Sequence, residues 1–177
     1  MNKSIRAWQM AGFVFTSVMG TFLHFLYEIS GENIIAALFS AVNESIWEHM
    51  KLLHYPMLAF ALTEWYFWGR REKGFWWVKL MGMLLGLGLI PVIYYTYTGI
   101  LGTSADWFNI AIFFLAAGAA FRLETWFFEK GKPFPGRDRA AFGLLLLIGA
   151  VFTLLTFWPP HIPFFRDPVT GSYGFTG

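Results

Sequence analysis

The sequence predicts an all-α membrane protein, a polytopic bundle of five transmembrane helices with the N-terminus inside and the C-terminus outside. Of its 177 residues, 56% are hydrophobic and only 14% are charged, which is more apolar than an ordinary soluble domain. Five apolar stretches are long enough to cross a bilayer, because a span takes roughly 20 residues. Basic residues cluster in alternate loops, as the positive-inside rule describes.

The predicted spans are separated by short breaks rich in glycine, proline and charge, which end helices. They occupy residues 8–30, 47–69, 75–98, 106–128 and 140–158 of a single integral membrane domain that covers 1–177. The apolar run 34–42 is too short to cross. It is predicted as a re-entrant or interfacial helix, with one long bent helix over 34–68 as the alternative. Prolines in the outer tail, 159–177, exclude a continuing helix.

The orientation follows from the basic residues, since short cytoplasmic loops hold an excess of lysine and arginine. Alternating spans place one set of them on the same side: Lys3, Arg6, Arg70, Arg71, Lys73, Lys79, Lys130, Lys132, Arg137 and Arg139. All nine tryptophans fall near the ends of spans, at the level that tryptophan prefers. We therefore expect the loops after the second and fourth spans to be cytoplasmic.

Histidines and carboxylates gather in the outer half of the predicted bundle. His24 and Glu28 are four residues apart at the outer end of the first span, so a helix places them on one face. Together with His161 of the tail they are the predicted ligands of a divalent metal, the one cofactor that these residue types suggest. A complete metal motif such as His-Glu-x-x-His is absent from the sequence.

The start of the second span supplies candidates for acid and base catalysis. Glu44, Glu48 and His54 are the predicted catalytic residues, because ionisable groups inside a span are costly and by default functional. Lys51 continues the helical stripe of Glu44 and Glu48, and with Asn43 it is predicted to contact substrate.

Structural alternatives stay open for the same segment. Glu44 is equally suited to the first turn of a helix capped by Asn43, and Glu48 with Lys51 to a local ion pair. His49 is either a ligand or a residue at the level of the lipid headgroups.

The tail is predicted to fold back over the outer mouth of the bundle. Such a closure would bring Arg166 and Asp167 near the first two spans, where they would help to hold a substrate. The alternative is a tail that lies on the surface and contacts headgroups.

The inner half carries features that we assign to architecture. Glu64 and Arg122 lie at similar predicted depth and are expected to pair, whereas Lys79 and Glu124 are close enough to the boundary to snorkel. Glycines at 82, 86 and 88 predict close helix packing, within the chain or between subunits of a homo-oligomer.

Several function classes lack support in this sequence. There is no cysteine, which excludes thiolate chemistry and disulfides, and no Gly-x-Ser-x-Gly nucleophile motif. No glycine-rich loop predicts nucleotide binding, and the basic residues flank spans instead of forming a nucleic-acid surface.

Two motifs, NESIWEHMK at 43–51 and FRDPVTGSYG at 165–174, resemble the signatures of an uncharacterised family of small bacterial multi-pass membrane proteins. The resemblance covers nearly the whole chain. It implies a bacterial plasma membrane and assigns no reaction.

Three functions therefore remain open. The first is a metal-dependent or acid/base enzyme, or a ligand-binding protein, that acts on a lipid or another amphiphile at the extracytoplasmic face. The second is a small transporter or channel that uses the same residues for an ion or proton. The third is a scaffold subunit without bound metal or activity.

Overall fold

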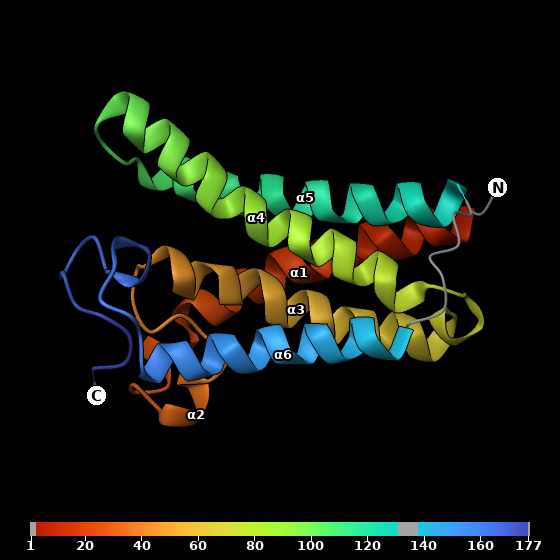
Figure 1. Cartoon of the computed structure of the whole chain (residues 1–177), viewed down its shortest axis with the longest axis horizontal. Coiled ribbons are helices and arrows are strands. Elements are labelled where there is room, and N and C mark those ends of the chain that lie inside the picture. Colours follow the sequence, from red (N-terminus) through yellow and green to blue (C-terminus); the bar gives the residue numbers. More distant parts are fainter. Residues whose placement is uncertain (1–2, 131–137, 177) are drawn as a thin grey trace.

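The bundle is built from helices throughout the part of the chain that the computed structural model describes, residues 3–130 and 138–176 (Figure 1). Its elements are α1 (Lys3–Ile29), α2 (Ile34–Ala37), α3 (Ile46–Phe67), η1 (Gly69–Arg71), α4 (Phe75–Leu101), α5 (Asp106–Lys130), α6 (Asp138–Phe157) and η2 (Pro163–Phe165). These ranges contain no strand, only one isolated bridge between Arg166 and Tyr173. The all-α fold class is thus confirmed, while Lys132 and Arg137 of the predicted inner loop lie outside the described residues.

Four of the five long helices are long and apolar enough to cross a membrane: α1, α4, α5 and α6. The fifth, α3, has 22 residues and so is about 33 Å long. It packs against α1, α4 and α6, and Figure 1 shows all five running along the long axis. It carries three buried charged side chains, Glu48, Lys51 and Glu64.

Large apolar side chains face outward along the bundle, including Val18, Ile100 and Leu147. In a soluble protein such a surface would favour aggregation, whereas lipid chains solvate it. Small residues pack the interior between α4 and α5. A Cβ atom added at Gly82 or Gly86 would collide with Glu124 or Leu53, but one at Gly88 would meet nothing within 4 Å. Gly88 therefore takes no part in close packing within the chain.

The chain breaks between α2 and α3, so the alternative of one bent helix is wrong. Ser45, not Asn43, is the N-cap of α3, with its hydroxyl accepting from the Glu48 amide at 3.4 Å. Residues 34–42 fold back beside the bundle, where the Ala37 carbonyl accepts from Lys51 and the Leu38 carbonyl from Thr153. These bonds satisfy irregular backbone, which apolar surroundings otherwise forbid.

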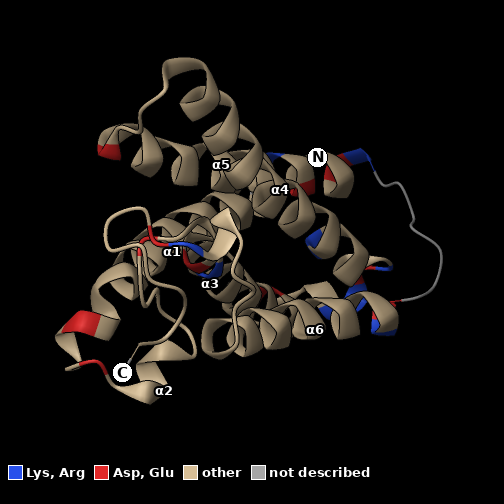
Figure 2. Cartoon of the chain, turned by 60° about the vertical axis from the view of Figure 1, so that its left-hand side comes forward, with Lys and Arg blue, Asp and Glu red and all other residues tan. Residues whose placement is uncertain are grey.

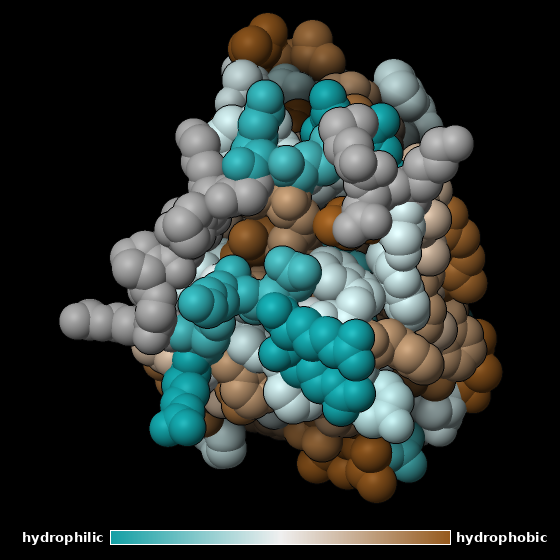
Figure 3. All heavy atoms as spheres, turned by 90° about the vertical axis from the view of Figure 1, so that its right-hand side faces the viewer, coloured by the Kyte–Doolittle hydropathy of each residue, from teal (hydrophilic) through white to brown (hydrophobic). Residues whose placement is uncertain are grey.

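Lysine and arginine gather at one end of the bundle, which we call the basic end (Figure 2). Its exposed members include Arg70, Arg71, Lys73, Lys130 and Arg139. Viewed end-on, this end is covered largely by hydrophilic side chains with apolar atoms between them (Figure 3). The opposite end, with α2 and the C-terminal tail, is called the outer end below.

A buried ion cluster lies toward the basic end, and it differs from the predicted pair. Lys79 contacts both Glu64 and Glu124, the latter at 2.6 Å, and Gln9 donates to Glu64 at 2.8 Å. Arg122 is exposed, so the expected Glu64–Arg122 pair is wrong, as is the snorkelling of Lys79 and Glu124. Two carboxylates from α3 and α5 meet the lysine of α4 inside the bundle, which removes its need to reach water.

The C-terminal tail packs back onto the outer end. Phe165 is only 6% exposed and stacks near Trp47, with ring centroids 4.7 Å apart. The Phe175 amide donates to the Thr156 carbonyl at 2.8 Å, and the Asn43 side chain donates to the Gly174 carbonyl at 3.1 Å. The tail is thereby tied to α3, α6 and the loop that precedes α3.

Candidate metal centre

Three potential metal ligands converge at the outer end from three separate elements. His24 lies on α1, Glu44 in the loop before α3, and His49 in the first turns of α3. The Nε2 atom of His49 is 3.4 Å from one Glu44 carboxylate oxygen, and Nε2 of His24 is 3.9 Å from the other. One ligand atom from each residue lies within 4.8 Å of the other two. The arrangement brings together two imidazoles and one carboxylate.

The orientation of His49 favours metal binding through Nε2. Its Nδ1 is 2.9 Å from the Ser45 carbonyl oxygen. Because a carbonyl only accepts, Nδ1 must carry the hydrogen, which leaves the Nε2 lone pair of the neutral ring directed at Glu44. Metal-bound histidines in proteins are typically held by such a bond from the other ring nitrogen.

The spacing of the three groups is close to what zinc requires. Ligand atoms about 2.0–2.2 Å from a tetrahedral ion lie about 3.3–3.6 Å apart. The imidazole nitrogens lie 3.4 and 3.9 Å from different Glu44 oxygens, and one ligand atom from each residue lies within 4.8 Å of the other two, so side-chain rotation would bring the three to this spacing. The side chains of His24, Glu44 and His49 are 30%, 48% and 29% exposed. Around an ion held by these three residues, this exposure would leave a fourth position open to water or a ligand, as in catalytic zinc sites.

The helix start explains why Glu44 joins this group. Since Ser45 caps α3, Glu44 precedes the helix and does not follow the stripe of Glu48 and Lys51. The Asn43 side chain accepts from the Ser45 amide at 2.9 Å and so shapes the loop. Glu44 is free to turn toward His24 instead of pointing along α3.

Other predicted ligands lie apart from this centre. Glu28 is exposed in the last turns of α1, and the ion pair that the structure describes for His24 is with Glu44. His161 is exposed on the tail, where its ring lies 4.7 Å from that of Tyr173. Neither residue belongs to the metal-capable group found among the described residues.

Of the two tail residues predicted to hold a substrate, Asp167 stabilises a turn within the tail itself. Asp167 is buried and accepts from the Val169 amide at 2.8 Å and the Thr170 hydroxyl at 2.7 Å. Arg166 is exposed beside this turn.

Glu48 and Lys51 form a closed network below the candidate centre. The Lys51 ammonium donates to Glu48 at 2.8 Å, to the Thr156 hydroxyl at 2.9 Å and to the Ala37 carbonyl at 2.9 Å. The Glu48 carboxylate also accepts from Thr156 at 2.7 Å. Both charged side chains are almost completely buried, which matches the local ion-pair alternative. The network joins α3, α6 and the 34–42 segment.

His54 lies deeper, without contact to the surface. It is 0% exposed and packs between Tyr55 and Phe152. Neither ring nitrogen has a hydrogen-bond partner within the described part of the chain.

A family model matches residues 1–175 of the chain, nearly its whole length. The chain belongs to DUF6512, a family of unknown function. No curated protein and no solved structure matches it. Family membership therefore confirms the resemblance and assigns no reaction to this DUF6512 protein.

Sequence reasoning left His49 open as a ligand and assigned Glu44 to catalysis, so it did not predict that both residues meet His24 in this DUF6512 protein. The sequence did contain a local signal for this arrangement, because Glu44, the capping Ser45 and His49 all lie within the six residues 44–49. The missing information was the position of the cap, because a helix that began at Asn43 would have turned Glu44 away from His49.

Proposed function

We propose that the protein is a five-span plasma-membrane protein that binds a divalent transition-metal ion, zinc by preference, through His24, Glu44 and His49. In this proposal the N-terminus and the basic end are cytoplasmic, and the 34–42 segment is re-entrant at the extracytoplasmic face. The open coordination position acts on the headgroup of a lipid or another amphiphile. The observation that carries the proposal is the convergence of the three ligand atoms, with His49 oriented by the Ser45 carbonyl.

The donor set determines the chemistry that such a centre supplies. Two neutral imidazoles and one carboxylate leave a net positive charge on a bound Zn²⁺, which lowers the pKa of a coordinated water and polarises a bound oxygen. Hydrolysis of an ester or phosphoester is the reaction class that this favours. The neighbouring Phe25, whose ring lies 4.8 Å from that of His24, is exposed and gives the site an apolar flank.

Ion or proton transport is a second candidate, favoured by the ionisable groups inside the bundle. The Glu48–Lys51 network and the Lys79 cluster would be the successive binding sites of the transported ion or proton. Against it, His54 and Glu64 are separated by ten residues of α3, about 15 Å, and the buried side chains between them are apolar. Proton flux into liposomes, abolished by Glu64→Gln, would favour transport over the metal centre.

Metal content of the purified protein tests the proposal. We expect about one zinc per chain in the wild type, and an affinity at least about a hundredfold lower in His24→Ala and His49→Ala, since each removes one of three ligands. His161→Ala is the matched control, because this exposed histidine lies outside the group. Protons compete for imidazole, so affinity should also fall as the pH is lowered.

Two results would contradict the proposal. Wild-type protein that takes up no zinc, cobalt or nickel would favour the scaffold function over the metal-binding function. Equal metal loss in His161→Ala would place the ion elsewhere. If zinc binds as expected, headgroup release from phospholipid vesicles should require zinc and be lost in His49→Ala; binding without any turnover would leave a metal-binding protein but no enzyme.

A further inference from the structure

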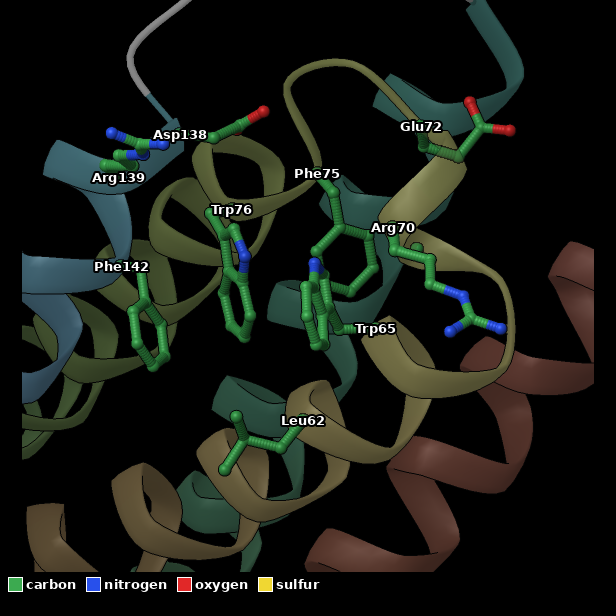
Figure 4. Close-up of a pocket in the computed structure, with 10 residues that line it drawn as sticks. Leu62, Trp65, Arg70, Glu72, Phe75, Trp76, Asp138, Arg139 and Phe142 are labelled. Carbon is green, nitrogen blue, oxygen red and sulfur yellow. The ribbon is translucent and has the colours of Figure 1, made fainter.

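A second candidate site lies at the basic end, opposite the metal centre. A cavity of about 360 Å³ opens there between the ends of α3 and α6, beside the first turn of α4 (Figure 4). It is separate from every residue assigned to the metal centre.

The walls of this cavity are aromatic and open toward lipid. Trp76 lies between Phe142 and Trp65, with ring centroids 4.4 and 6.3 Å away, and Leu62 lies below them in Figure 4. Leu62 and Trp65 are 42% and 40% exposed on α3, at the end of a membrane-length helix. An acyl chain lying along α3 would contact both.

The rim of the cavity carries one partly buried carboxylate and one exposed guanidinium. Asp138 accepts from the Gly74 amide through Oδ2 at 3.0 Å, but its Oδ1 atom is buried and has no partner among the described residues. Arg139 lies beside it, above Phe142 (Figure 4). The other charged lining residues, Arg70 and Glu72, point away from the cavity in the same view, with Arg70 over the Tyr66 ring.

Because Asp138 lines the cavity, an ammonium group there would pair with its carboxylate. The tryptophan faces attract the same cation. Arg139, one residue further along α6, is placed to pair with a phosphate, for which guanidinium is well suited. The site thus offers complementary charge to a zwitterion with an apolar chain.

We propose that this cavity binds a phospholipid whose ammonium and phosphate are joined by two carbons, that is, a phosphatidylethanolamine. Its ammonium pairs with the Asp138 carboxylate, its phosphate meets Arg139, and one acyl chain lies along Leu62 and Trp65. The concentration of basic residues at this end puts the rim at the level of the headgroups. The proposal holds for either orientation of the protein and does not depend on the metal centre.

Native mass spectrometry of the detergent-solubilised full chain tests it with three lipids of identical acyl chains. Phosphatidylethanolamine should bind roughly tenfold more tightly than phosphatidylcholine, which lacks N–H donors, and phosphatidylglycerol, which lacks the cation. Equal binding of the three lipids, or tighter binding of either competitor, would overturn the proposal.

Variants locate the binding on the protein. Asp138→Asn should reduce the lipid preference to within about twofold, since the charge-assisted bond is lost. Glu72→Gln is the matched control, and it should keep the preference. Trp65→Ala should weaken the binding of all three lipids to the same extent. A preference retained in Asp138→Asn would place the lipid elsewhere; should that variant fail to fold, the lipid series on the unaltered protein decides.

Discussion

At the scale of residues, the buried Glu48–Lys51 ion pair is completely hydrogen-bonded. Lys51 has three acceptors and Glu48 has donors for both carboxylate oxygens, with partners from α6 and the 34–42 segment. Such a network is compatible with an apolar core because no group in it remains unpaired. Its role is to hold the backbone that positions Glu44.

Lys51→Met should destabilise the protein by about 3–5 kcal/mol, because the Glu48 carboxylate would stay buried without its cation. The double variant Glu48→Leu/Lys51→Met should recover much of that loss, since no uncompensated charge remains. Denaturant unfolding in a fixed detergent measures both. A single variant as stable as wild type would show that water reaches Glu48.

At the scale of elements, close packing of α4 against α5 depends on particular glycines. A methyl group at Gly82 would lie 2.5 Å from Glu124 Oε1, and the other oxygen of this carboxylate, Oε2, accepts from Lys79. Glu124 cannot move aside without breaking this contact, so the glycine supports the ion cluster as well as the packing of the two helices.

Gly82→Ala should therefore lower stability by about 1–3 kcal/mol through overpacking. Gly88→Ala is the control on the same helix, where the added methyl meets nothing, and it should be neutral or slightly stabilising. Thermal unfolding in detergent compares the two. Equal midpoints would mean that α4 and α5 shift apart freely.

At the scale of the whole molecule, the two ends differ in charge and in what they expose. The basic end has the aromatic cavity, whereas the outer end has the histidine–glutamate group and the packed tail. The proposed orientation puts the metal centre outside the cell and the lipid cavity inside.

Cysteine labelling tests this orientation directly, because the chain has no cysteine of its own. A cysteine placed at Thr103, in the exposed loop between α4 and α5, should react with an impermeant maleimide on intact cells. One placed at Lys73, in the exposed loop before α4, should react only after the membrane is opened. The reverse pattern would invert the topology.

The sequence by itself determined the all-helical class of the protein, the positions of the long helices and the gathering of histidines toward the outer end. These follow from hydropathy and length, which are read along the chain without knowledge of neighbours. It also contained the Glu48–Lys51 pair, because three residues on a helix bring two side chains together.

Only the tertiary structure decided which distant groups meet. Lys79 pairs with carboxylates from two other helices, a choice that no spacing encodes. His24 meets Glu44 and His49 because Ser45 begins α3 and leaves Glu44 in a loop. Helical periodicity relates residues within one helix, and it cannot place a loop carboxylate against a histidine twenty residues earlier.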